Sequence, residues 1–590
     1  MIGPARAAIL AGALALLPPA ALAASGPAVE AENGMVVSSQ RLASEVGADI
    51  LRAGGNAVDA AVAVAYAEAV TNPCCGNIGG GGFLLLHTAG GESRFVNFRE
   101  TAPAAASRDM YLDAAGEVVK GASLHGWKAA GVPGTVLGLN TALAKYGTLP
   151  LATVLAPAIA LARDGFVLTR GDTDILETGT RLFAREANVA RIFLRPDGTP
   201  WRPGERLVQA DLARTFQAIA DGGSDAFYRG EIPKKVEAAS RAGGGLLTAA
   251  DFSAYTVTEA DPIACRYRTA TILSAPPPSS GGTTLCEILT VLDGYDLRAA
   301  GFNSARTVHL MVEAMRRAYA DRNADLGDPA FVQNPVERLI SPAYAEQLRG
   351  TIRPGRATPS VEVRPADNAL GPRERAQTTH ISVMDKGGTA VSLTYTINGY
   401  FGSGVIAGDT GFLLNDEMDD FTVKLGVPNL FGLVQGTANA IEPRKRPLSS
   451  MAPTLVLREG RPVMVVGSPG GSRIITINAQ TIMNMLDHGM EPQAAVDAPR
   501  IHHQWLPDTV YAEPFALSAD TQAVLKGMGH SLTEQSPWGA QELIAVRGAV
   551  PPTPAAASSG NDASRTVRMR HGFLYGANDN RRPAGAAVGE

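Results

Sequence analysis

Two runs of alternating side chains, residues 378–384 and 389–396, constrain the fold of this chain more than any other feature. In each run apolar residues alternate with polar ones, a pattern that is typical of a β-strand with one buried face. The residues between the runs, Asp385 to Gly388, include two glycines and favour a tight turn with a glycine in the left-handed conformation. The sequence therefore predicts an antiparallel β-hairpin here.

The register of this hairpin sets two threonines beside each other. If Asp385 pairs with Thr389, Thr378 lies opposite Thr396, and the polar rows of both strands share one face. Thr378 also follows a stretch, residues 353–377, that is rich in Pro, Arg and Gly and lacks apolar periodicity. We expect this stretch to be exposed and mobile, so Thr378 marks the change from a mobile segment to a strand.

A threonine in this position can support self-cleavage of the chain. Its hydroxyl can attack the carbonyl group of Gln377 and move the acyl group from nitrogen to oxygen, and hydrolysis of that ester leaves Thr378 as a new N-terminus. The α-amino group that is released ordinarily has a pKa of about 7.7–8.0 and can act as base for the neighbouring hydroxyl. A simpler interpretation remains open, in which two β-branched residues only begin a strand.

The N-terminus has the pattern of an export signal. A charged start precedes an apolar run from Ala7 to Leu17 and the cleavage pattern Ala21-Leu22-Ala23, which together predict a signal peptide over residues 1–23. The apolar run is too short for a membrane span, no cysteine near the cut offers a lipid anchor, and no later segment is long and apolar. We expect a soluble, periplasmic or secreted protein without a membrane anchor.

The sequence gives no indication of nucleic acid, metal or cofactor binding. A formal charge of -5 over 590 residues is small for a nucleic-acid partner. The match to G-x-G-x-x-A at residues 402–407 is not followed by the start of a helix, so we expect no dinucleotide. The cysteines and the isolated His502-His503 pair lack zinc-site spacing, and we expect no metal. Four cysteines allow three disulfide pairings, which the sequence leaves open: Cys74, Cys75, Cys265 and Cys286.

Periodicity predicts further elements on both sides of the hairpin. We expect helices over residues 42–70 and 474–488, a mainly helical region over 152–349 with a break at 275–282, and an amphipathic helix at 311–322. A low-complexity surface loop is expected at 551–565. Strands are expected at residues 83–87, 94–98, 411–414, 454–457 and 463–466.

Long motifs that occur in order along the chain resemble the γ-glutamyltranspeptidase family. They include "NPCCGNIGGGGFLL", "NFRETAP", "APPPSSGG", "YADRNADLGDP", "QTTHISVMDKGG", "NDEMDDF", "PRKRPLSSMAPT" and "GSPGGSRIIT". The similarity extends from about Val36 almost to the end of the chain. It implies an α+β fold, the four-layer αββα sandwich of N-terminal-nucleophile hydrolases. It also implies a self-cleaving precursor whose helix-rich large subunit, residues 24–377, and small subunit, residues 378–590, form a heterodimer that shares this sandwich.

The resemblance also implies a pocket for a γ-glutamyl group, which bears an α-carboxylate and an α-ammonium. Thr378 is then the nucleophile, Thr396 its hydrogen-bond partner, and the N–H groups of Gly470 and Gly471 the oxyanion hole. The same resemblance assigns the carboxylate to Arg99, Ser449 and Ser450, and the ammonium to Asn398, Glu417 and Asp420.

A lid over this pocket corresponds to residues 425–440. Phe431 stands where many bacterial members of the family have tyrosine, so its ring cannot donate a hydroxyl hydrogen bond to a latch.

The function implied by the resemblance is hydrolysis of glutathione and related γ-glutamyl compounds, with transfer of the γ-glutamyl group to water, amino acids or peptides. One alternative is a cephalosporin or glutaryl acylase of the same superfamily. A glutaryl group has no ammonium, so Glu417 and Asp420 argue against it. Another is a non-catalytic periplasmic amino-acid-binding protein, which has no need of the Gln377-Thr378 junction or the glycine pair. The preferred acceptor, the balance of hydrolysis and transfer, and the oligomeric state stay open.

Overall fold

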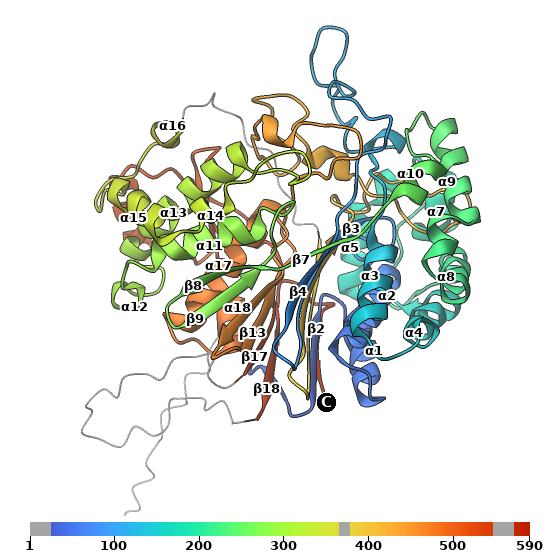
Figure 1. Cartoon of the computed structure of the whole chain (residues 1–590), viewed down its shortest axis with the longest axis horizontal. Coiled ribbons are helices and arrows are strands. Elements are labelled where there is room, and N and C mark those ends of the chain that lie inside the picture. The colour runs from blue at the N-terminus through green and yellow to red at the C-terminus, as the bar shows by residue number, and fades with distance from the viewer. Residues whose placement is uncertain (1–24, 365–377, 547–571) are drawn as a thin grey trace, which may run out of the picture.

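Two seven-stranded sheets lie face to face in the computed structural model, and helices cover both outer faces (Figure 1). The structure describes residues 25–364, 378–546 and 572–590. The expected signal peptide, Gln377 and the expected loop at 551–565 lie outside these residues. The described chain forms the four-layer αββα sandwich that the sequence predicted.

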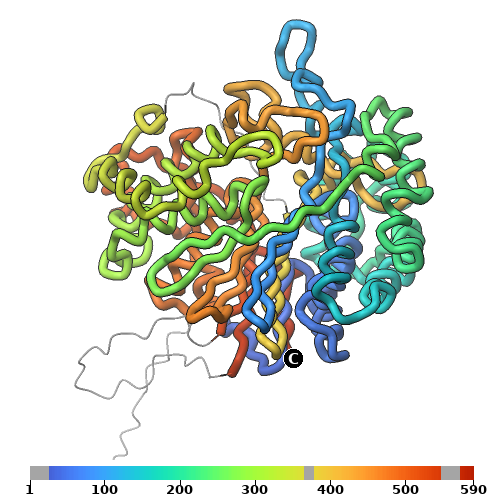
Figure 2. Tube along the Cα trace, in the orientation of Figure 1, coloured from blue at the N-terminus to red at the C-terminus, as the bar shows by residue number. Residues whose placement is uncertain are grey.

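The predicted hairpin lies at the centre of the first sheet. Its strands β10 and β11 pair with each other, and they lie between β2 and β3, two strands from the N-terminal part of the chain (Figure 2). The backbone N–H of Asp385 donates to the Thr389 carbonyl over 3.1 Å, and Gly388 has a φ of +90°. The predicted register is therefore confirmed. The strand order of this sheet is β19 (Ala586–Gly589), β2 (Gly34–Ser38), β10 (Thr379–Asp385), β11 (Ala390–Thr396), β3 (Gly81–His87), β4 (Ser93–Phe98) and β7 (Thr258–Ala260).

The second sheet contains the other strands that the sequence predicted near residues 454–466. Its inner face packs on the first sheet through a shared apolar core that includes Val37, Leu85, Leu455 and Val465. This packing is the aligned face-to-face arrangement expected when two sheets each bury one face. The strand order is β1 (Val29–Ala31), β18 (Leu574–Asn578), β17 (Glu542–Val546), β13 (Arg461–Gly467), β12 (Thr454–Arg458), β9 (Ala270–Ser274) and β8 (Ile263–Tyr267).

Helices from the N-terminal part of the chain cover the first sheet, on the right of Figure 1. The helical pattern predicted over residues 42–70 is confirmed, but the chain forms two helices there with a break at residues 53–56. Asn56 ends the break at Gly54-Gly55 and caps the second helix, since its side chain accepts from the N–H groups of Val58 and Asp59. The helices on this side are α1 (Arg41–Arg52), α2 (Ala57–Thr71), α3 (Thr135–Tyr146), α4 (Leu151–Asp164), α8 (Ala210–Tyr228), α9 (Glu231–Ala242) and α10 (Ala249–Ala254).

The outer face of the second sheet is covered by α11 (Gly281–Leu292), α13 (Ala305–Asp325), α17 (Ile474–Leu486) and α18 (Pro492–Asp497). The helix predicted at residues 311–322 is confirmed within α13, but its predicted exposed polar face is wrong, because α13 is buried on all sides from Thr307 to Asn323. Its charged side chains form buried ion pairs, such as Arg317 with Glu313 at 2.7 Å and Arg316 with Asp508 at 2.5 Å. A second layer of chain covers the polar side of α13, which the sequence pattern predicts to be exposed to solvent.

That second layer includes the first part of the stretch that we expected to be mobile. Thr358 and Ser360 are buried, and their backbone N–H groups donate to Glu313 (3.0 Å) and Asp508 (2.7 Å). The expectation of an exposed segment is therefore wrong for Ala357, Thr358 and Ser360, whereas residues 353–356 and 361–362 are exposed as expected. Polar side chains of α13 hold this segment in place of the apolar contacts that periodicity detects, and residues 365–377 lie outside the described part.

Two further expectations about local structure are resolved. The strand expected at residues 411–414 is wrong, because only an isolated bridge joins Ile406 to Leu413. Gly411 lies tightly against α8, where a Cβ atom would stand 2.3 Å from the backbone nitrogen of Leu212, so the segment packs on a helix and not beside a strand of either sheet. The cysteines pair as Cys74 with Cys75 and Cys265 with Cys286.

Shorter elements complete the described chain. None of the helices that the structure describes is long and apolar enough to cross a membrane. The short strands are β5 (Phe166–Val167), β6 (Arg206–Leu207), β14 (Ile501–His502), β15 (Val510–Ala512) and β16 (Leu532–Glu534). The remaining helices are α5 (Arg170–Thr178), α6 (Thr180–Phe183), α7 (Ala187–Phe193), α12 (Leu297–Ala300), α14 (Val336–Leu339), α15 (Pro342–Thr351), α16 (Ser360–Val363) and α19 (Ala519–Gly527), with 3₁₀ turns η1 (Trp127–Ala129), η2 (Glu417–Asp420), η3 (Thr437–Asn439) and η4 (Gly471–Arg473).

Candidate active site

The two threonines of the hairpin meet at one end of β10 and β11. The Thr378 hydroxyl donates to the Thr396 Oγ1 over 3.4 Å, and the backbone N–H of Asn398 donates to the same oxygen over 2.8 Å. Thr378 and Thr396 are both buried. The pairing of the strands therefore places the predicted nucleophile and its predicted hydrogen-bond partner in contact.

One pocket collects side chains from segments far apart in the sequence. Its lining includes every described residue that the sequence assigned to the site except Gly470, which is adjacent to a lining residue. The pocket also includes Arg322, which sequence reasoning missed, although it belongs to the quoted motif "YADRNADLGDP". The predicted residues that line it are Arg99, Thr378, Thr396, Asn398, Glu417, Asp420, Phe431, Ser449, Ser450 and Gly471.

Opposite charges face each other inside the pocket. The guanidinium of Arg99 is fully buried and donates to Glu417 through Nη1 and to Asp420 through Nη2. Glu100 lies 3.5 Å from Arg99 Nη1, so three carboxylates surround one guanidinium. The expected charges lie at the expected place, but they pair directly with each other, which the sequence did not predict.

Burial sets the ionisation of this cluster. It raises the pKa of Glu417 well above its usual range and also raises the pKa of Asp420, although Arg99 opposes both shifts. Burial raises the pKa of Glu100 to about 7. It acts to lower the pKa of the Arg99 guanidinium, but the surrounding carboxylates outweigh it and raise that pKa. The cation is thus held in its charged form, and proton uptake falls on the carboxylates.

The glycine pair forms a sharp turn between β13 and α17. Gly470 and Gly471 have φ values of +151° and +55°, which side chains with a Cβ atom rarely adopt. A Cβ atom on Gly471 would lie 2.4 Å from the Phe431 ring. The turn therefore requires glycine both for its conformation and for the close approach of the lid.

The lid, residues 425–440, packs against the pocket although Phe431 has no tyrosine hydroxyl. Phe431 is buried against Gly471, and its carbonyl accepts from the Gln504 side chain over 3.0 Å. The Asn429 side chain donates to Asp420 over 3.3 Å, and the Leu430 backbone N–H donates to Asp419 over 2.7 Å. Backbone and amide contacts thus take the place of the latch that Phe431 cannot make.

The two serines and Asn398 differ in how they are held. The Ser449 Oγ accepts from the Met451 backbone N–H over 3.1 Å, and the Ser450 Oγ accepts from Arg322 Nη2 over 3.0 Å. The Asn398 side chain donates to the Asp416 carbonyl over 3.1 Å. Both serine oxygens therefore act as acceptors toward the protein.

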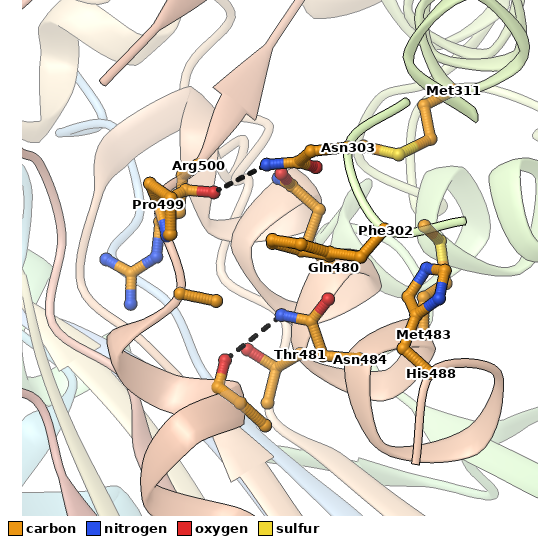
Figure 3. Close-up of a pocket in the computed structure, with 12 residues that line it drawn as sticks. Phe302, Asn303, Met311, Gln480, Thr481, Met483, Asn484, His488, Pro499 and Arg500 are labelled. Carbon is orange, nitrogen blue, oxygen red and sulfur yellow. Dashed lines mark hydrogen bonds between the residues drawn. The ribbon is translucent and has the colours of Figure 1, made fainter. Parts of the chain in front are cut away.

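Two other polar clusters lie away from the pocket. A small pocket between the start of α13, α17 and Pro499 is bridged internally, since Asn303 donates to the Pro499 carbonyl over 3.4 Å (Figure 3). It contains none of the predicted site residues. His309, Glu313 and His530 also meet, but the histidines hydrogen-bond each other over 2.8 Å and Glu313 pairs with Arg317.

A family model and curated relatives both assign this chain to one family. The family model for γ-glutamyltranspeptidase matches residues 43–587. A glutathione hydrolase proenzyme of Pseudomonas sp. (strain A14) is 51% identical over 96% of this chain and 96% of its own. A glutathione hydrolase proenzyme of Escherichia coli (strain K12) is 47% identical over 88% of this chain and 89% of its own.

A solved structure of similar architecture is the cephalosporin acylase from Bacillus halodurans. It superimposes with a TM-score of 0.80 at 27% identity and covers 96% of this chain and 98% of its own. The fold, the ordered motifs and the family model agree over nearly the whole length of the chain. The chain belongs to the γ-glutamyltranspeptidase family.

Proposed function

We propose that this protein is a precursor that cuts itself before Thr378 and then acts as a γ-glutamyltransferase and glutathione hydrolase. The relatives at 47–51% identity are named glutathione hydrolase proenzymes, which supports both parts of the proposal. The observation that carries it is the pocket itself, where a paired cation and carboxylates lie beside two contacting threonines. A γ-glutamyl group is a zwitterion at its α-carbon and needs both charges.

Binding exchanges one set of ion pairs for another. The α-carboxylate of the donor takes the guanidinium of Arg99, with the hydroxyls of Ser449 and Ser450 as further donors. The α-ammonium takes the carboxylates of Asp420 and Glu417 that Arg99 releases. Each buried charge keeps an opposite partner, so the desolvation cost of a lone buried charge is avoided.

Catalysis begins when the hydroxyl of Thr378 attacks the γ-carbonyl carbon of the donor. The α-amino group freed by self-cleavage accepts the hydroxyl proton and passes it to the leaving amine, which is cysteinylglycine for glutathione. The γ-glutamyl ester on Thr378 Oγ1 is then attacked by water or by an acceptor amine. The N–H groups at Gly470 and Gly471 would stabilise the oxyanion of each tetrahedral intermediate, because glycines have no side chains of their own to block its approach.

Maturation divides the chain at the Gln377-Thr378 bond. The large subunit, residues 24–377, supplies Arg99, and the small subunit, residues 378–590, supplies Thr378 and Asp420. The names of the relatives as proenzymes support this division. The N-terminal pattern over residues 1–23 supports export to the periplasm or beyond, with removal of that segment.

The competing function is that of an acylase, the name of the superimposable structure. The decisive assay compares γ-glutamyl-p-nitroanilide with glutaryl-p-nitroanilide, which lacks only the ammonium, and includes glutathione. We expect the γ-glutamyl substrate to be preferred by at least about 30-fold, because the pocket carboxylates are otherwise left without a cation. Preference for the glutaryl substrate, or no turnover of glutathione, would contradict the proposal.

A further inference from the structure

Arg322 of α13 is a buried cation whose direct partners are all neutral. Its guanidinium donates to the Ser280 Oγ (2.9 Å), the Ser450 Oγ (3.0 Å), the Gln435 Oε1 (3.0 Å) and the Asn323 Oδ1 (2.8 Å). Among the residues that the structure describes, no carboxylate forms an ion pair with it. Its exposed fraction is 1%, and it lines the pocket of Thr378.

Several buried arginines of the described chain pair with carboxylates. Arg317 on the same helix pairs with Glu313 at 2.7 Å, and Arg500 pairs with Asp579. Arg99 faces three carboxylates. Arg446, like Arg322, donates only to neutral oxygens, but it does not line the pocket of Thr378. Burial lowers the pKa of Arg322 to about 10, which leaves it charged at neutral pH. A buried charge that forms no direct ion pair is costly, so its presence in a ligand pocket indicates an anion that binds there.

The hydrogen bonds around Ser450 show where that anion would lie. A serine hydroxyl has one hydrogen to donate and two lone pairs that accept. Arg322 Nη2 occupies a lone pair of the Ser450 Oγ, which leaves the hydroxyl hydrogen for another acceptor and polarises it toward donation. Ser449 is prepared in the same way, since its Oγ accepts from the Met451 N–H. Two hydroxyl hydrogens are therefore available to one acceptor-rich group such as a carboxylate.

Arg322 also connects the walls of the pocket. Its Nη1 donates to Gln435 in the lid, and the Gln435 side chain donates to the backbone carbonyl of Asp420 over 3.0 Å. On the other side, Ser280 accepts from Arg322 Nε and donates to the Ser449 carbonyl over 2.6 Å. This contact gives the "APPPSSGG" motif a structural role, since it ties the start of α11 to the serine loop.

We propose that Arg322 is a positioning residue for donor recognition, which holds and polarises Ser450 so that the pocket selects donors with a free α-carboxylate. Arg99 alone is surrounded by three carboxylates, and Arg322 supplies the second positive charge on the carboxylate side. This inference rests on the proposed γ-glutamyl transfer at the same site. The ligand class is an amino-acid donor that carries both an α-ammonium and an α-carboxylate.

The test uses two donors that differ only in that carboxylate. γ-Glutamyl-p-nitroanilide is compared with 4-aminobutyryl-p-nitroanilide, which retains the amine and lacks the α-carboxylate. For Arg322→Gln we expect KM for the first donor to rise by about 10-fold to 100-fold with a much smaller change in kcat. The kcat/KM for the second donor should change little, so selectivity for the carboxylate falls.

Arg317→Gln is the matched control, because it also removes a buried guanidinium from α13 but does not line the pocket. It should affect both donors alike. If Arg322→Gln lowers kcat/KM equally for both donors, or leaves selectivity unchanged, Arg322 has only a structural role and the inference is wrong. An inactive wild-type enzyme would instead contradict the proposed function.

Two further variants keep the inference testable if Arg322→Gln does not fold. Arg322→Lys keeps the charge but cannot bridge Ser280 and Ser450, so it should recover only part of the lost selectivity. Ser450→Ala should reproduce the selectivity loss, and the double variant should add little to it, because both act through one hydrogen bond. Additive losses, or full selectivity in Arg322→Lys and Ser450→Ala, would contradict the inference.

Discussion

At the scale of single residues, the pocket is governed by charges that are largely buried. Arg99, Glu417 and Asp420 pair across the pocket while Glu100 lies behind them. Sequence motifs identify these residues one by one, but their mutual pairing depends on the sheets that bring residue 99 beside residue 420. The sequence did not identify Arg322, because an arginine in a helix normally lies on a solvated face and its burial here depends on distant contacts.

Asp420→Asn tests recognition of the donor ammonium. Losing one partner of a buried charged contact typically costs about 2–5 kcal/mol, so kcat/KM for γ-glutamyl-p-nitroanilide should fall by roughly 30-fold to 5,000-fold. Glutaryl-p-nitroanilide should lose far less, because it has no ammonium to leave unpaired.

The matched control for Asp420 is Asp419→Asn. Asp419 is also buried, but it holds Ser123 and the lid backbone and does not line the pocket. It should affect both substrates alike, and both variants must first be shown to be fully cleaved. Equal losses on both substrates for Asp420→Asn would contradict its role in recognition.

Glu100 predicts a pH dependence of stability. Its pKa is raised by burial from 4.5 to about 7, so the unfolded chain loses this proton at lower pH than the folded one. Its contribution to the free energy of unfolding is therefore fully present below about pH 4.5 and is lost as pH rises to about 7.

The measurement is the free energy of unfolding of Thr378→Ala and Thr378→Ala/Glu100→Gln, which we expect to remain single chains. Relative to its parent, the Gln variant should gain up to about 3 kcal/mol between pH 4.5 and pH 7. A difference that stays constant over this range would show that Glu100 has an ordinary pKa in the folded chain.

At the scale of elements, local patterns predicted the strands well and the helices less well. The hairpin was predicted with its register, because alternation and two loop glycines act within a short stretch of chain. The α1–α2 break depends on the Asn56 cap, and the burial of α13 depends on residues 353–364, which are distant in sequence. Burial by residues that are distant in sequence cannot be recognised from the periodicity of the helix itself.

The Cys265–Cys286 disulfide, which joins β8 to α11, gives a prediction at this scale. It closes a loop with a sequence separation of 21 residues, so Cys265→Ala/Cys286→Ala should lose about 3 kcal/mol of stability in the single-chain Thr378→Ala background. The matched control is Cys74→Ala/Cys75→Ala, whose bond joins adjacent residues and constrains almost no chain. A larger loss of stability in the control, measured by denaturant unfolding, would contradict this account.

At the scale of the whole molecule, the sandwich explains why one precursor serves a two-subunit enzyme. Strands from both sides of the proposed cut alternate in the first sheet, where β10 and β11 lie between β2 and β3 (Figure 2). Arg99 and Arg322 come from before the cut, and the remaining pocket residues come from after it. Neither proposed subunit carries all the residues of this pocket, so the two must stay associated after the proposed cut.

The most direct test of this account is a denaturing gel with N-terminal sequencing of the purified wild-type protein and of Thr378→Ala. The wild-type protein should run as two chains, and the smaller chain should begin Thr378-Thr379-His380. Thr378→Ala should remain a single, uncut and inactive chain, because it has no hydroxyl to attack the Gln377 carbonyl. A Thr378→Ala protein that is still cut, or a small chain that begins at another residue, would contradict Thr378 as the residue that performs both cleavage and catalysis.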